Sequence, residues 1–129
     1  MSKVKKKILI IEDDLALQRA LQEKFQSKDF VVFTANDGEA GLELALAKHP
    51  DITLLDLLLP KIDGMTALKR LRADSWGKHA KVIVLTNLND KAKVAEGLES
   101  GMDGSYDYLV KTDWSLDEVV KKVKGKLEM

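Results

Sequence analysis

Short apolar runs alternate along this chain with stretches in which apolar residues recur every three or four positions. The apolar runs are bounded by turn-forming residues and predict five strands, at 8–11, 30–35, 52–55, 82–85 and 106–110. Helical spacing is clearest at 15–25 and predicts further helices at about 38–48, 64–73, 90–100 and 115–127. Strands and helices therefore alternate five times.

This alternation predicts the fold class. Nearly continuous apolar strands, each followed by a helix, are typical of a parallel sheet that helices cover on both faces. We therefore expect an α/β protein, a doubly wound (βα)₅ fold with a five-stranded parallel sheet. Ser115, with Glu118 three residues later, is the expected N-cap of the last helix. Ligands of such sheets bind beyond the carboxyl ends of the strands.

Length and composition narrow the classes of protein. The 129 residues suit one domain, expected over 1–129 with no output domain. Lys+Arg and Asp+Glu are equal at 21 each, which argues against general attraction to nucleic acid or to a membrane surface. The chain has no cysteine, so thiolate and disulfide chemistry are excluded. The N-terminal apolar run 8–11 is too short for a signal peptide or a membrane span, and we expect a cytoplasmic protein.

Acidic residues follow two of the predicted strands. Glu12, Asp13 and Asp14 come directly after the first strand, and Asp56 follows the third. Clustered carboxylates repel one another unless a cation lies among them, and oxygen ligands in small number suit Mg²⁺. A simpler interpretation is that the first three acids cap the helix that begins near Leu15. Both interpretations stay open at this point.

Four segments carry a family resemblance: ILIIEDD (8–14), ITLLDLLLPKIDG (52–64), VIVLTN (82–87) and DYLVK (107–111). Thr86 and Lys111, at the ends of the fourth and fifth strands, are weak signals singly, but a hydroxyl and an ammonium can both reach a phosphoryl oxygen. In this order the segments closely resemble the receiver domain of bacterial response regulators in two-component signalling, including the single-domain chemotaxis type. The resemblance spans nearly the whole chain and implies the flavodoxin-like strand order 2-1-3-4-5.

The resemblance also implies roles at the acidic site. Asp56 matches the residue that accepts a phosphoryl group in a Mg²⁺-dependent reaction, and it would itself be a ligand of Mg²⁺. Asp13 would bind Mg²⁺ directly and Glu12 through a water molecule. The backbone carbonyl of Leu58 would be the third protein ligand. Pro60 and Gly64 match a loop in which the family needs a restricted φ at one point and conformational freedom at another.

Further implied roles concern the phosphoryl group and the signal. Thr86 and Lys111 would hold the phosphoryl oxygens, and Thr86 and Tyr108 would act as switch residues. They would reshape the face formed by the fourth helix, fifth strand and fifth helix. The phosphoryl donor would be a histidine kinase or histidine phosphotransfer protein. A downstream protein would be the partner that responds to the phosphorylated chain. We expect a monomer or weak homodimer that is not an enzyme, apart from catalysing its own phosphorylation and dephosphorylation.

The sequence departs from the family at several positions. Thr112 follows Lys111 where the family usually has a cis-proline, so we predict a trans bond there. The loop 101–106 is a few residues longer than usual. Leu58 and Leu88 are apolar where the family often has polar side chains, and we predict a long-lived phosphoaspartate.

Three other classes compete with this interpretation. A haloacid dehalogenase-type phosphohydrolase would need a second aspartate two residues after the nucleophile, where this chain has Leu58. A flavodoxin-like flavin site would need a Ser/Thr/Gly-rich loop after the first strand, where this chain has three acids. A receiver fold that only docks other proteins and is never phosphorylated remains as the alternative.

Overall fold

The computed structural model describes residues 4–86, 107–110 and 115–129. The helices and strands along the chain are β1 Lys7–Ile11, α1 Leu15–Gln26, β2 Val31–Ala35, α2 Gly38–Lys48, β3 Ile52–Asp56, α3 Gly64–Ala73, the 3-10 helix η1 Gly77–His79, β4 Val82–Thr86, β5 Asp107–Val110 and α5 Leu116–Lys126. All five predicted strands are confirmed, with ends that shift by a residue or so. Four of the five predicted helices are confirmed, and the remaining one, at 90–100, lies outside the described residues.

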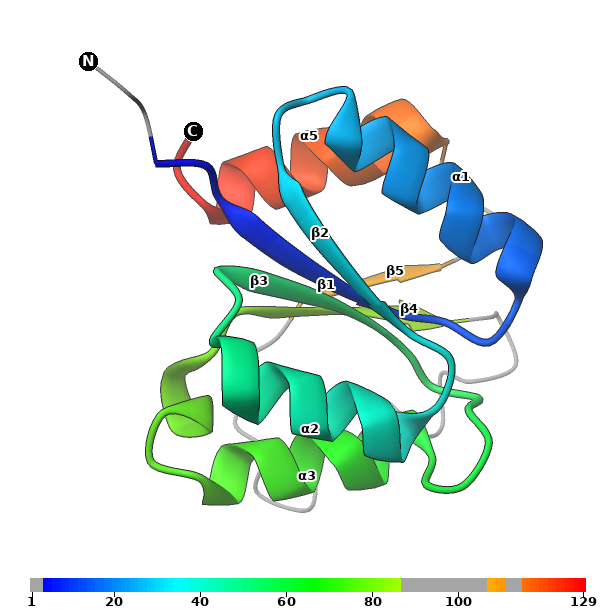
Figure 1. The fold of residues 1–129 in the computed structure, drawn as a ribbon, viewed down its shortest axis with the longest axis vertical. Helices are drawn as coiled ribbons and strands as arrows, with labels where there is room; N and C mark the ends of the chain where they lie inside the picture. Colours follow the sequence, from blue (N-terminus) through cyan, green and yellow to red (C-terminus); the bar gives the residue numbers. More distant parts are fainter. Residues whose placement is uncertain (1–3, 87–106, 111–114) are drawn as a thin grey trace.

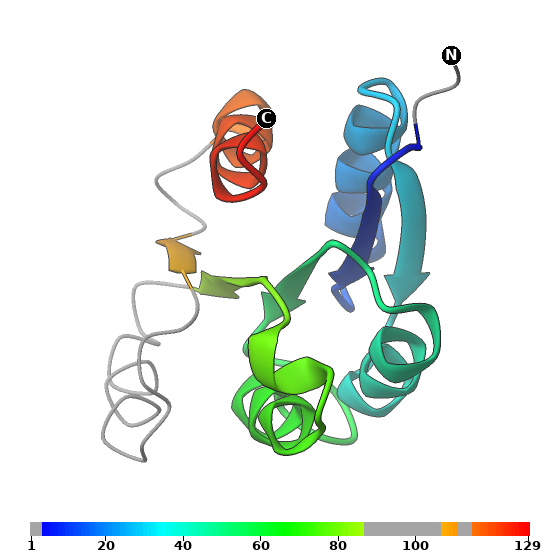
Figure 2. The same cartoon turned by 90° about the vertical axis from the view of Figure 1, so that its left-hand side faces the viewer.

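The five strands form one parallel sheet with the order β2-β1-β3-β4-β5. Figure 1 and Figure 2 show α1 and α5 on one face of this sheet and α2 and α3 on the other. The predicted doubly wound fold with flavodoxin-like strand order is therefore confirmed. The chain steps from β1 outward to β2 and then back past β1 to β3. The carboxyl ends of β1 and β3 thus lie side by side where the order reverses.

Two apolar clusters explain why the strands are almost continuously apolar. Successive side chains of a strand point to opposite faces of a sheet. Ile8 and Ile10 of β1 belong to the cluster beneath α1 and α5, whereas Leu9 and Ile11 belong to the cluster beneath α2 and α3. All four side chains are buried. A strand covered on both faces needs apolar residues at every position, which is the pattern in the sequence.

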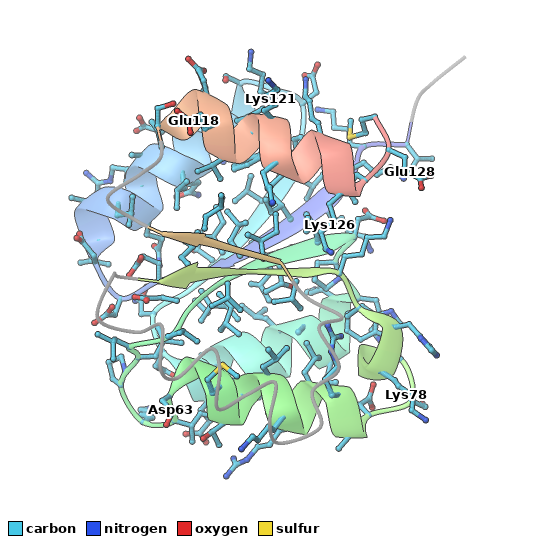
Figure 3. The ribbon with its side chains drawn as sticks, turned by 180° about the vertical axis from the view of Figure 1, so that it is seen from behind. Asp63, Lys78, Glu118, Lys121, Lys126 and Glu128 are labelled. Carbon is cyan, nitrogen blue, oxygen red and sulfur yellow. The ribbon has the colours of Figure 1, made fainter. Side chains whose placement is uncertain are left out.

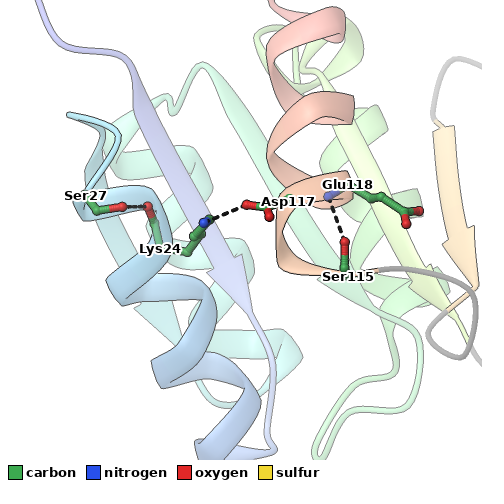
Figure 4. Close-up of polar contacts among 5 residues, drawn as sticks. All are labelled: Lys24, Ser27, Ser115, Asp117 and Glu118. Atoms are coloured by element: carbon green, nitrogen blue, oxygen red, sulfur yellow. Dashed lines mark hydrogen bonds and ion pairs between the residues drawn. The ribbon is translucent and has the colours of Figure 1, made fainter.

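Polar contacts fix the helix that ends the chain. The Ser115 hydroxyl accepts a hydrogen bond from the Glu118 N–H at 3.3 Å, which confirms the predicted N-cap of α5 (Figure 4). In the same first turn of α5, a carboxylate oxygen of Asp117 lies 2.7 Å from the Lys24 ammonium of α1 (Figure 4). The hydrogen bond and charge of Lys24 lower the pKa of Asp117 below its ordinary value. This ion pair joins the two helices on one face of the sheet.

Charged side chains lie at both ends of the sheet. Figure 3 shows Asp63 beside the start of α3, at the end where β3 stops, and Lys78 and Lys126 at the opposite end. The 3-10 helix that carries Lys78 was not predicted. It is held by Asp74, whose carboxylate accepts from the Trp76 and Gly77 N–H groups.

In the described part of the chain, no helix combines the length and apolar character needed to cross a membrane.

Candidate functional site

Three carboxylates from two neighbouring strands meet at the carboxyl edge of the sheet. Glu12 and Asp13 follow β1, and Asp56 is the last residue of β3. One oxygen from each side chain can be chosen so that all three lie within 4.8 Å of one another. Glu12 and Asp56 are buried, at 0% and 3% exposure, whereas Asp13 is exposed. The predicted acidic site is therefore present, with one carboxylate facing solvent.

The segment after β1 is fixed by several hydrogen bonds. The Glu12 N–H donates to the Ala35 carbonyl at 3.1 Å and so extends the pairing of β1 with β2. The Glu12 carboxylate accepts from the Asp14 N–H at 3.2 Å. Asp14 itself caps α1, because its carboxylate accepts from the N–H groups of Ala16 and Leu17. Capping is thus confirmed for Asp14, while Glu12 and Asp13 lie in the carboxylate cluster.

The segment after β3 places Asp56 against the start of α3. The Asp56 carboxylate accepts from the Leu58 N–H at 3.3 Å, and the Gly64 N–H donates to the Leu57 carbonyl at 2.9 Å. A Cβ atom on Gly64 would lie only 2.2 Å from the Asp56 carbonyl oxygen. The expected need for conformational freedom at Gly64 was wrong, since its φ is outside the left-handed region. Glycine is required there because the backbone of β3 is so close.

The donor set suits Mg²⁺. All the side-chain ligands are carboxylate oxygens, which a small, hard cation prefers. On an octahedral ion with bonds of about 2.0–2.1 Å, two bound oxygens lie roughly 3–4 Å apart. The spread of 4.8 Å in the cluster is slightly larger, which leaves room for one carboxylate to bind through water. Three carboxylates at this spacing repel one another, and a divalent cation would relieve that repulsion.

Other predicted site residues are placed only in part. Thr86 is the last residue of β4 and pairs with Val110 of β5, so its backbone lies at the same edge of the sheet as Asp56. Tyr108 lies within β5. The side chains of Thr86 and Tyr108 are outside the described part of the chain. The side chain of Leu58 is 45% exposed beside the site.

Several predictions fall on residues that the structure does not describe. These are the role of Lys111, the trans bond at Lys111–Thr112, the loop 101–106 and the position of Leu88. They stay predictions.

One residue that supports the site was missed in the sequence. The side chain of Gln18 is buried and donates to the backbone carbonyls of Glu12 and Ala35. A signal was available, because Gln18 lies three positions before Leu21 and seven before Phe25, on the buried face of α1. A polar residue on an apolar helical face needs hydrogen-bond partners, and here the partners lie at the ends of β1 and β2.

Doubly wound parallel sheets bind their ligands where the strand order reverses, and in this chain a carboxylate cluster lies at that point. Comparisons with known proteins identify the family. The model of the response regulator receiver domain family matches residues 8–124. The chain therefore belongs to the response regulator receiver domain family of two-component signalling.

Curated relatives are longer than this chain. It is 41% identical over 104 residues to the transcriptional regulatory protein AfsQ1 of Streptomyces coelicolor, covering 81% of this chain and 44% of that protein. It is 36% identical over 121 residues to the DNA-binding dual master transcriptional regulator RpaA of Synechocystis, covering 94% of this chain and 48% of that protein. The chain thus spans less than half the length of these two relatives.

Solved structures of receiver domains match over nearly their whole length. The receiver domain of a Francisella response regulator has a TM-score of 0.80 at 31% identity, with 95% of this chain and 97% of that chain covered. The receiver domain of a sensor histidine kinase from Pseudomonas aeruginosa has a TM-score of 0.84 at 25% identity, with 98% and 100% covered. The latter structure has a magnesium ion coordinated in its active site cleft. Receiver domains bind Mg²⁺ in an acidic pocket, and this chain has such a cluster.

Proposed function

We propose that this chain accepts a phosphoryl group onto Asp56 from a histidine kinase or histidine phosphotransfer protein, in a reaction that requires Mg²⁺. The observation that carries the proposal is the position of Asp56. It ends β3 within 4.8 Å of the carboxylates of Glu12 and Asp13, in a chain of the receiver family. Receiver domains in general interact with histidine kinases and phosphotransfer proteins, which makes a phosphohistidine the natural donor.

The proposed reaction is an in-line transfer. A carboxylate oxygen of Asp56 attacks phosphorus, the N–P bond of the phosphohistidine breaks, and its electron pair returns to the imidazole, which takes up a proton. The Leu58 N–H orients the Asp56 carboxylate through its bond of 3.3 Å. Glu12, Asp13 and Asp56 would hold Mg²⁺, together with the Leu58 carbonyl. When bound, Mg²⁺ supplies positive charge to the oxygens of the transferred group.

Residues at the ends of β4 and β5 complete the proposed site. Thr86 would donate a hydrogen bond to a phosphoryl oxygen, and Lys111 would neutralise charge on it. Support comes from the resemblance of these positions to the family and from the backbone of Thr86 at the same sheet edge. Apart from its own phosphorylation and dephosphorylation, the chain would catalyse no reaction.

The proposed signal is a change of surface that a separate protein recognises. On phosphorylation, Thr86 would move toward the phosphoryl group and Tyr108 would turn inward, which would reshape the face of the predicted helix 90–100, β5 and α5. The downstream partner would be a protein in the cytoplasm, and the chain would act as a monomer or weak homodimer. Size-exclusion chromatography with and without a phosphoryl donor measures that last point directly.

A matched pair of variants tests the phosphoryl acceptor. A radiolabelled phosphohistidine donor is mixed with the wild-type chain, with Asp56→Asn and with Asp63→Asn. Asp63 is an exposed acid in the same loop, where asparagine can still cap α3. Label is expected on the wild type and on Asp63→Asn but not on Asp56→Asn. Equal labelling of Asp56→Asn would contradict the assignment, and no labelling of the wild type would favour a protein that only docks others.

A further inference from the structure

A single buried amide joins the ends of β1 and β2 behind the acidic site. Gln18 of α1 is 8% exposed. Its Nε2 atom donates to the carbonyl oxygens of Glu12 and Ala35 at 2.9 and 3.1 Å, and to the side-chain oxygen of Asn36 at 2.6 Å. The orientation of the amide follows from these partners, because the flipped amide would place its oxygen against two carbonyl oxygens. α1, β1 and β2 are neighbours in Figure 1.

The backbone of Gln18 holds the other end of the same segment. Its N–H donates to the Asp14 carbonyl at 2.9 Å, while its side chain holds the Glu12 carbonyl. One residue therefore fixes both ends of the three-residue turn from β1 into α1. Asp13, the exposed carboxylate of the cluster, lies between these two anchor points.

Glu12 is held by hydrogen bonds at three points. Its N–H donates to the Ala35 carbonyl, its carbonyl accepts from Gln18, and its carboxylate accepts from the Asp14 N–H. A buried carbonyl that loses its donor tends to reorient toward another partner. Rotation of the peptide group between Glu12 and Asp13, which contains that carbonyl, would change the directions of both side chains. The spacing of the acidic cluster thus depends on the Gln18 amide.

We propose that Gln18 is a positioning residue for the cation site, which keeps Glu12 and Asp13 in the arrangement that binds Mg²⁺ before the ion arrives. This role rests on the proposed function of the same site. A residue that served only the stability of the core would affect the free energy of unfolding but not the affinity for the ion. Hydrogen-bond partners of metal ligands typically change metal affinity by about 10–100-fold when they are removed.

Isothermal titration calorimetry with Mg²⁺ separates the two roles. The wild type is compared with Gln18→Met, which keeps the length of the side chain but has no donor, and with Gln26→Met, the same change at an exposed position of α1. Gln18→Met is expected to raise the Kd for Mg²⁺ by at least about tenfold. Gln26→Met is expected to leave the Kd unchanged. Urea unfolding in EDTA verifies that each variant is folded.

The outcomes are distinct for this inference and for the proposed function. Mg²⁺ binding by the wild type with an equal Kd for Gln18→Met would overturn the role of Gln18 alone. No Mg²⁺ binding by the wild type would overturn the proposed function, and this role with it.

A measurement on the wild type covers the case in which Gln18→Met does not fold. Coupling between two events is reciprocal, so if the Gln18 hydrogen bonds favour Mg²⁺ binding, Mg²⁺ must favour those bonds. Saturating Mg²⁺ is therefore expected to slow hydrogen exchange of the Gln18 side-chain amide, measured by NMR, and to leave that of exposed Gln26 unchanged. Unaltered exchange at Gln18 would overturn the proposal.

Discussion

Gly64 lies at the start of α3, directly against the end of β3, and its replacement by alanine tests how the site is built. An added Cβ would lie 2.2 Å from the Asp56 carbonyl oxygen and 2.7 Å from the Leu57 Cα atom. Both atoms belong to the backbone, so no side-chain rotation relieves the contact. Overpacking of this kind costs about 1–3 kcal/mol of unfolding free energy. The shift that relieves the contact would also displace Asp56 from Glu12 and Asp13.

Urea unfolding in EDTA measures the effect on stability. For a slope of about 2 kcal/mol per M, a loss of about 2 kcal/mol lowers the urea midpoint by about 1 M. Gly125→Ala is the matched control, because a Cβ there meets nothing within 4 Å and α5 gains a better helix former. We expect that control to raise stability by up to about 1 kcal/mol. A midpoint for Gly64→Ala at or above that of the wild type would refute the reasoning.

Three further predictions concern the cation, the phosphoryl group and pH. Mg²⁺ at one hundred times its Kd should stabilise the wild type by about 2.7 kcal/mol in urea unfolding, and Asp13→Asn should lose most of this gain. Leu58→Asn combined with Leu88→Glu should speed loss of the phosphoryl group, because polar side chains can orient the attacking water. The decay of radiolabel measures this rate, and an unchanged rate would reject the prediction of a long-lived phosphoaspartate. Since the pKa of Asp117 is lowered in the folded chain, its pair with Lys24 should stabilise the fold above the ordinary Asp pKa of 3.8, and this contribution should vanish as pH falls through the lowered value. Asp117→Asn should therefore have a lower free energy of unfolding than the wild type at pH 7 but not in strong acid. An equal difference in unfolding free energy at both pH values would count against a stabilising role of the ion pair.

The fold could be predicted because its pattern is encoded locally. β1 and β3 carry apolar residues at nearly every position, which only a strand covered on both faces requires. The acids at the ends of these strands predicted the site, since parallel strands bring their carboxyl ends to one edge. Asp14 and Glu12 look alike in the sequence, yet one caps α1 and the other is buried in the cluster. Their separate roles depend on how β1 turns into α1.

Other features could not be predicted because they depend on contacts that form only in the folded chain. Gly64 is required by the backbone of β3, which lies against it only in the folded chain. η1 is held by the Asp74 carboxylate and by Arg72, which donates to the Gly77 and Ala80 carbonyls, and hydrophobic periodicity does not reveal these polar contacts. Gln18 has partners in two strands, so its importance follows from the sheet order and not from α1 alone.

The most direct test of the central claim is the intact mass of the chain after incubation with acetyl phosphate and Mg²⁺. The wild type is compared with a sample that contains EDTA and with Asp56→Asn. We predict one phosphoryl adduct on the wild type, and none without Mg²⁺ or without the Asp56 carboxylate. An adduct that forms equally on Asp56→Asn, or a wild type that gains none under any condition, would contradict the account.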